Sequence, residues 1–142
     1  DLDKRAEILL FLADRTEHFG KIIKPNLDKM ILSDRGFVSG MAYALAGGNF
    51  SFEELLNLNK FALQGNFPQK IVFFKANEST LRSRLGSRTQ MDGIEARGFA
   101  YLLRVQDAME EILQKLDVRY VTIDAAMDEE KITNLIKEFI ND

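Results

Sequence analysis

Cysteine is absent from this sequence, and His18 is its only histidine. The lack of cysteine excludes disulfides, thiolate metal sites and a cysteine nucleophile. A single histidine cannot form a histidine metal cluster. His18 lies near the end of a predicted helix, where a positive charge complements the helix dipole, and we interpret it as a surface residue.

Long apolar runs are also missing, because no uninterrupted stretch could span a bilayer. The first residues carry charges of both signs and show no signal-peptide pattern. We therefore expect a cytoplasmic protein with no membrane partner. The net charge of −3 provides no general polycationic surface, so we expect no nucleic-acid partner either.

The composition that remains is typical of one globular domain. Of the 142 residues, 46% are hydrophobic and 29% are charged, and no linker or repeat divides the chain. A chain of this length can bury a sizeable core. We therefore treat residues 1–142 as parts of a single domain.

Hydrophobic patterning predicts strands that alternate with helices. Apolar runs that read as buried strands cover residues 30–33, 70–75 and 119–124. Helical patterns cover residues 4–19, 37–46, 51–63, 78–85, 95–116 and 129–140. Ser51 and Glu54 form a capping-box pattern, Asn77 can cap the helix that follows it, and Pro25 should end the segment after the first helix. This alternation predicts an α/β fold with a mainly parallel sheet.

The helix predicted at residues 4–19 is apolar nearly all round in its first half. Such a helix must be covered on more than one side. One side can pack on a sheet, and the other suggests a partner subunit.

Asp34, Arg35 and Gly36 follow the first predicted strand directly. Ligands of open parallel sheets bind at the carboxyl ends of strands, and a guanidinium can hold a phosphate there through two hydrogen bonds. Asp34 could orient that arginine or hold a hydrated Mg²⁺ through water. The alternative is that Asp34 caps the next helix and Arg35 forms a surface ion pair.

A second group of basic residues surrounds a glycine-flanked loop between Gly86 and Gly93. Its members are Arg82, Arg84, Arg88, Arg97 and Arg104. Mobile basic segments of this kind can close over an anionic substrate, which predicts a lid. The alternative is a solvated helix face whose arginines pair with Asp92 and Glu95.

Phe11 and Arg15 are four residues apart, so they share one face of the first helix. A ring can stack on a base, and a guanidinium can donate to the carbonyl edge of that base. The alternative is that Phe11 belongs to the core. Tyr43 also allows two interpretations, because its hydroxyl could face either a sugar or solvent.

Taken together, these segments resemble thymidylate kinases, the P-loop enzymes that phosphorylate dTMP. The resemblance rests on "AEILLFLADR", "ILSDRGFVSGMAYAL", "LRSRLGSRTQMDGIE" and "YVTIDA" in this order, and it runs from Lys4 to the last helix. It implies a three-layer, P-loop kinase-like α/β fold with a parallel sheet flanked by helices. It also implies ATP and Mg²⁺ as cofactors, a role in dTTP biosynthesis, and a homodimer formed through residues 4–19.

The resemblance assigns roles to individual residues. Phe11 would stack on thymine and Arg15 would contact the base, while Ser39 and Tyr43 would line the base and sugar pocket. Tyr43 would disfavour a ribose 2′-hydroxyl. Catalysis would involve Arg35 at the acceptor phosphate, Asp34 in the magnesium and phosphate network, and Arg88. The lid, residues 82–97, would place Arg82, Arg84 and Arg88 over ATP, with Asp124, Ala125 and Ala126 near the adenine.

The sequence departs from the family pattern at several positions. Gly36 replaces the usual aromatic residue after Asp-Arg, Lys75 stands where an acidic residue is common, and Gly93 replaces a basic lid residue. No G-x-x-x-x-G-K-[ST] motif occurs, nor does the family's Arg-Glu-Pro-Gly-Gly stretch. A strand, P-loop and helix would need about 30 further residues.

The chain therefore looks like the C-terminal major part of a thymidylate kinase domain, without the N-terminal strand and P-loop. We expect these residues alone neither to transfer phosphate nor to fold as a native monomer. The main hypothesis is ATP-dependent phosphorylation of dTMP to dTDP. The alternatives are a monophosphate kinase with another acceptor, such as dUMP or a ribonucleotide, and a catalytically inactive nucleotide-binding or dimerisation module.

Overall fold

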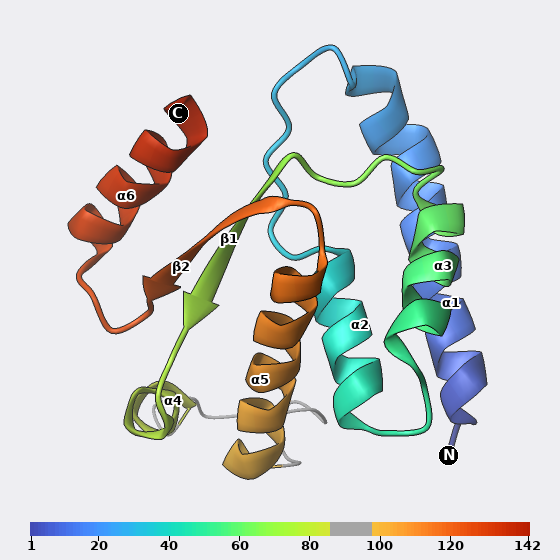
Figure 1. Cartoon of the computed structure of the whole chain (residues 1–142), viewed down its shortest axis with the longest axis horizontal. Helices are drawn as coiled ribbons and strands as arrows, with labels where there is room; N and C mark the ends of the chain where they lie inside the picture. Colours follow the sequence, from blue (N-terminus) through green and yellow to red (C-terminus); the bar gives the residue numbers. More distant parts are fainter. Residues whose placement is uncertain (86–97) are drawn as a thin grey trace. The chain divides into compact units, whose positions relative to one another are not determined.

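The structure is a computed structural model that describes residues 1–85 and 98–142 (Figure 1). The chain forms two compact units, Asp1–Phe67 and Pro68–Asp142. We call them unit 1 and unit 2. The start of the helix predicted at 95–116 lies outside the described residues.

Unit 1 is made of helices. Its elements are α1 (Lys4–His18), the π-helical turn η1 (Phe19–Ile23), the 3-10 turn η2 (Lys24–Asn26), α2 (Phe37–Ala46) and α3 (Phe52–Ala62). Asp3 caps α1 by accepting hydrogen bonds from the backbone N–H groups of Arg5 and Ala6. Pro25 lies in the last turn of the helical run, as its missing N–H and fixed backbone angle predict.

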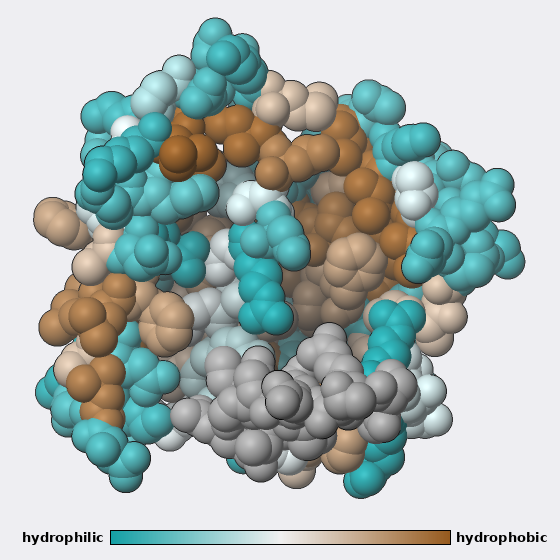
Figure 2. Space-filling view, turned by 180° about the vertical axis from the view of Figure 1, so that it is seen from behind, coloured by the Kyte–Doolittle hydropathy of each residue, from teal (hydrophilic) through white to brown (hydrophobic). Residues whose placement is uncertain are grey.

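The helices of unit 1 pack on one another around an apolar core. Phe19, Phe37, Met41 and Leu55 are nearly inaccessible to solvent. The rings of Phe37 and Phe67 lie with their centroids 4.8 Å apart. α1 itself has no fully buried residue. Several of its apolar side chains therefore remain at the surface, where they are visible at the left of Figure 2.

The predicted strand at residues 30–33 is wrong. The structure has no regular secondary structure between η2 and α2. Met30 and Leu32 are 72% and 75% exposed. A strand forms only where its backbone groups find a partner ladder, and the described part of unit 1 contains no other strand. The segment is apolar, as a buried strand would be, but unit 1 contains no strand that could pair with it.

Unit 2 combines two strands with three helices. β1 (Lys70–Lys75) and β2 (Arg119–Asp124) pair in parallel, in a register that joins Lys70 to Arg119 and Lys75 to Asp124. α4 (Glu78–Leu85) and α5 (Phe99–Lys115) lie between the strands in sequence, and α6 (Glu129–Asn141) follows β2. The Asn77 side chain accepts from the Thr80 N–H, which confirms the predicted cap of α4.

The core of unit 2 lies around the strands and α5. Phe73, Val105, Ile112 and Ile123 are buried there. At the start of β1, the Lys70 Nζ donates to the backbone carbonyls of Phe139 and Ile140, each at 2.9 Å. A cation at the end of α6 satisfies carbonyls that have no partner within the helix.

The predicted α/β class is confirmed, with many helices and a small parallel sheet. Apart from residues 30–33, each predicted strand and helix that falls within the described residues is present. Within those same residues, no helix is both long and apolar enough to cross a membrane.

Candidate functional site

Two packed helices of unit 1 carry four of the predicted site residues. Phe11 and Arg15 lie on α1, one helical turn apart. Ser39 and Tyr43 have the same spacing on α2, and both are half-buried. Because α1 contacts α2, the structure brings the two predicted pairs into one region of the unit.

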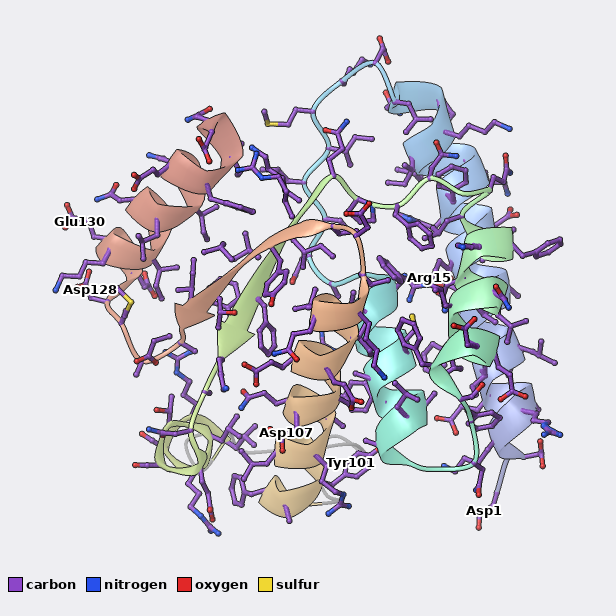
Figure 3. All side chains as sticks on the ribbon, viewed as in Figure 1. Asp1, Arg15, Tyr101, Asp107, Asp128 and Glu130 are labelled. Carbon is purple, nitrogen blue, oxygen red and sulfur yellow. The ribbon has the colours of Figure 1, made fainter. Side chains whose placement is uncertain are left out.

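Arg15 is the most informative residue of this region. Its side chain is half-buried, and it extends from α1 towards α2 (Figure 3). Burial lowers the pKa of the Arg15 guanidinium, an effect that the nearby Asp14 carboxylate opposes. Among residues 1–85 and 98–142, no hydrogen bond or ion pair holds this guanidinium. A partly desolvated cation with unused donors is suited to a ligand that offers acceptors.

Gly40 is the part of α2 that lies closest to Arg15. A Cβ atom at this position would be 3.3 Å from Arg15 Nη2, and apart from its chain neighbours and the backbone of α2 itself, no other heavy atom of the described residues would lie within 4 Å of it. The guanidinium is therefore placed against the bare backbone of α2.

Phe11 does not belong to the core of unit 1. Its ring is 58% exposed, whereas the core ring of Phe37 is 2% exposed. The alternative that Phe11 is a core residue is therefore wrong for this unit. An exposed ring next to a half-buried guanidinium offers both a stacking surface and a forked donor.

The Asp34-Arg35 pair lies in the irregular segment immediately before α2, and both side chains are exposed. The α2 N-cap is Gly36, and no side chain bonds to it, so the alternative that Asp34 caps this helix is wrong. Neither residue forms an ion pair within the described residues. The charges of both residues therefore remain available to a ligand.

Arg35 has an unusual backbone conformation. Its φ is 68°, in the left-handed region that residues other than glycine rarely adopt, and its carbonyl accepts from Ser33 Oγ at 3.0 Å. Such conformations cost free energy and are often found at functional sites. This observation marks Arg35 as a candidate independently of its charge.

In unit 2, the carboxyl ends of β1 and β2 lie together. The Ala125 N–H donates to the Lys75 carbonyl at 2.8 Å, and Asp124 Oδ1 accepts from the Ala126 N–H at 2.9 Å. The Lys75 Nζ lies 2.8 Å from Glu110 Oε2 on α5, and this hydrogen bond raises the Lys75 pKa. The positive charge of Lys75 is thus paired with the carboxylate of Glu110.

The predicted lid arginines differ in their contacts. Arg84 donates to the Ala125 carbonyl, so the structure brings together two residues that the resemblance assigned to the ATP side. Arg82 instead bonds to Glu78 at 2.6 Å and lies over the Phe99 ring, 4.5 Å from its centroid. Arg88, and residues 86–97 of the predicted lid, lie outside the described residues.

Two residues that position these groups were not predicted from the sequence. One is Gly40, and the signal for it was a glycine in the middle of a helical pattern. The other is Gln106 of α5. Its side-chain amide accepts from the Ala76 N–H at 2.8 Å and donates to the Ala76 carbonyl at 2.9 Å, directly after β1. No sequence pattern marks such a contact between distant segments.

A metal site built from protein side chains alone is not evident. In the part of the chain that the structure describes, no three histidine or carboxylate residues cluster in a way that could hold a metal ion. Asp34 is an isolated exposed carboxylate, which suits a Mg²⁺ ion that keeps its waters and is held mainly by phosphates.

Comparison with known proteins matches this chain to one family. The sequence model of the thymidylate kinase family matches residues 1–136. A thymidylate kinase of Campylobacter curvus (strain 525.92) is 54% identical over 98% of this chain and 72% of its own length. A thymidylate kinase of Sulfurovum sp. (strain NBC37-1) is 50% identical over 96% of this chain and 71% of its own length.

A third relative, from Campylobacter concisus (strain 13826), is 55% identical over 99% of this chain and 72% of its own length, and it is also a thymidylate kinase. The inactive-module alternative gains no support from these matches. The P-loop kinase-like α/β fold implied by the resemblance is that of the matched family. The chain belongs to the thymidylate kinase family.

Proposed function

We propose that this chain serves the ATP-dependent phosphorylation of dTMP to dTDP, and that unit 1 provides the acceptor site. The family match and the relatives support the reaction. The observation that carries the acceptor site is the half-buried guanidinium of Arg15, which has no hydrogen bond within the described residues. Thymine offers carbonyl oxygens that such a donor can bind.

The base would lie on Phe11, whose ring is accessible for stacking. Ser39 and Tyr43 of α2 would face the base and the sugar, because they share a helix face in the region where α1 contacts α2. Tyr43 would leave too little room for a ribose 2′-hydroxyl. These roles are the ones that the resemblance implies, and the residues that would fill them lie on two helices that contact each other.

The phosphate of dTMP would be held by Arg35, whose exposed guanidinium has no ion-pair partner among the described residues. Phosphoryl transfer relies mainly on positioning and on positive charge around the transferred group. Asp34 would contribute through the water shell of Mg²⁺, which would neutralise phosphate charge when bound.

The donor nucleotide would be held by unit 2. Arg84 and Ala125 are in contact there, and Asp124 organises the turn that contains Ala125. Arg82 and Arg88 complete the predicted set on the ATP side. Arg82 has structural partners in Glu78 and Phe99, so its role would require it to exchange them for a phosphate.

We also propose a homodimer formed through α1, in the cytoplasm. Leu9 and Leu10 of this helix are 58% and 61% exposed, in the half of the helix that is apolar nearly all round. A second copy would remove this apolar surface from water.

A panel of acceptors tests the proposal by calorimetric titration of the full chain. We expect dTMP to bind more tightly than dCMP, because dCMP presents an amino donor where thymine has a carbonyl. We expect dTMP to bind more tightly than thymidine, and this difference should disappear in Arg35→Ala. Equal binding of dTMP, dUMP and a ribonucleotide would favour the alternative acceptor hypothesis, and absence of dTMP binding would contradict the acceptor site.

A further inference from the structure

Gly40 occupies an interior position of α2, where glycine is one of the least favourable residues. Its φ does not lie in the left-handed region, so the local backbone does not require glycine. Alanine would fit the helix conformation better and would reduce the entropy of the unfolded chain. A helix-weakening residue at this position therefore calls for an explanation outside the helix itself.

The surroundings of Gly40 provide one. Outside its chain neighbours and the backbone of α2, an added Cβ would meet a single atom of the described residues within 4 Å, Arg15 Nη2 at 3.3 Å. This distance is shorter than ordinary van der Waals contact, so the guanidinium would have to move by a few tenths of an ångström. Because it is the far end of a flexible side chain, it can move without unfolding the unit.

We propose that Gly40 is a positioning residue that sets the location of the Arg15 guanidinium and thereby the discrimination between nucleobases. This inference rests on the proposed function of Arg15 as the base-binding group. Because Gly40 has no Cβ, the guanidinium can lie close to the backbone of α2, and this approach would set the position of its donors relative to Phe11 on the preceding turn of α1.

The chemistry explains why a small displacement matters. A guanidinium only donates hydrogen bonds, so it can bond to a carbonyl oxygen but offers no acceptor to an amino group. Hydrogen bonds weaken steeply as their distance and angle depart from the optimum. A shift of the guanidinium should therefore reduce binding of a carbonyl-bearing base more than binding of an amino-bearing base.

The test compares Gly40→Ala with a matched control, Gly20→Ala. Gly20 lies in the helical turn η1, where an added Cβ would meet nothing within 4 Å. For Gly40→Ala we expect dTMP binding about threefold to tenfold weaker in calorimetric titration of the full chain. The preference for dTMP over dCMP should fall with it. The melting temperature should be unchanged or higher, whereas Gly20→Ala should alter neither affinity nor preference.

A double-mutant cycle shows whether the effect passes through Arg15. If it does, Gly40→Ala should have no further effect on dTMP affinity in an Arg15→Ala background. An equal loss in both backgrounds, or unchanged dTMP affinity and preference in Gly40→Ala alone, would overturn the inference while leaving the proposed function intact. If the unaltered chain showed no preference for dTMP over dCMP, both the proposed function and this inference would be wrong.

Discussion

At the scale of single residues, the exposure of Phe11 separates a ligand-binding ring from a core ring. Phe11→Ala should weaken dTMP binding by roughly fivefold to 100-fold, as expected for loss of one stacked base. It should barely change the free energy of unfolding, because the ring is 58% exposed. Titration calorimetry and thermal unfolding of the same variant measure both quantities.

Phe37→Ala is the matched control for this prediction. Its ring is 2% exposed and packs on Phe67, so its removal should cost about 3–5 kcal/mol of folding free energy. If Phe11→Ala destabilised the chain as strongly as Phe37→Ala, the assignment of Phe11 to a ligand site would be wrong.

Sequence spacing predicted which candidate residues share a helix face, but it did not predict the contacts between segments that organise them. The spacing of Phe11 and Arg15, and of Ser39 and Tyr43, follows from the periodicity of a helix, which sequence reveals. The left-handed conformation of Arg35 and the approach of Arg15 to Gly40 depend on how segments meet, and no local pattern encodes them.

At the scale of secondary-structure elements, the start of α3 depends on a capping box. Ser51 accepts from the Glu54 N–H at 3.1 Å, and Glu54 Oε2 accepts from the Ser51 N–H at 2.9 Å. These hydrogen bonds lower the Glu54 pKa. The folded chain therefore favours ionised Glu54, so this contribution to stability is present above the unfolded pKa of about 4.3. It disappears as the pH falls through the lower folded pKa.

The corresponding prediction concerns Glu54→Gln. Its melting temperature should lie below that of the unaltered chain at neutral pH, and the difference should shrink as the pH falls through the lowered pKa of Glu54, because that side chain then becomes neutral. Glu53→Gln, at a neighbouring position of the same turn, is the control. A difference that stayed constant from neutral pH to the acid end of the stable range would show that the carboxylate charge has no part in the cap.

The junction between β1 and α4 depends on Gln106. Both of its hydrogen bonds reach the backbone of Ala76, which is 8% exposed. Gln106→Leu would leave these backbone groups without partners and should lower the free energy of unfolding by about 1–3 kcal/mol. Denaturant titration measures this loss. Gln114→Leu, at an exposed position of α5, should have almost no effect, and an equal loss in both variants would exclude a specific role for Gln106.

The elements also show where sequence-based prediction succeeds and where it fails. Caps, breakers and periodicity are local, and they predicted α2, α3, β1, α4, β2 and α6 correctly. A strand needs a partner that is distant in sequence, and the segment at residues 30–33 has an apolar pattern but no partner strand in unit 1. Its three apolar side chains remain accessible to solvent for that reason.

At the scale of the whole molecule, the exposed leucines of α1 predict self-association. Leu10→Asp should shift the chain towards the monomer, because a carboxylate in an apolar interface is costly to desolvate. Light scattering coupled to gel filtration measures the mass directly. Phe61→Asp replaces the ring of α3 that is 83% exposed and should leave the mass unchanged. A monomeric unaltered chain would contradict the proposed dimer.

The central claim is that unit 1 recognises dTMP through Arg15, and titration of the full chain with dTMP tests it most directly. We predict saturable binding, weakened about tenfold to 100-fold in Arg15→Ala, because a hydrogen bond to a charged group is lost. Arg5→Ala, an exposed arginine on the same helix, should bind dTMP like the unaltered chain. Equal binding by all three proteins, or no binding by any, would contradict the account.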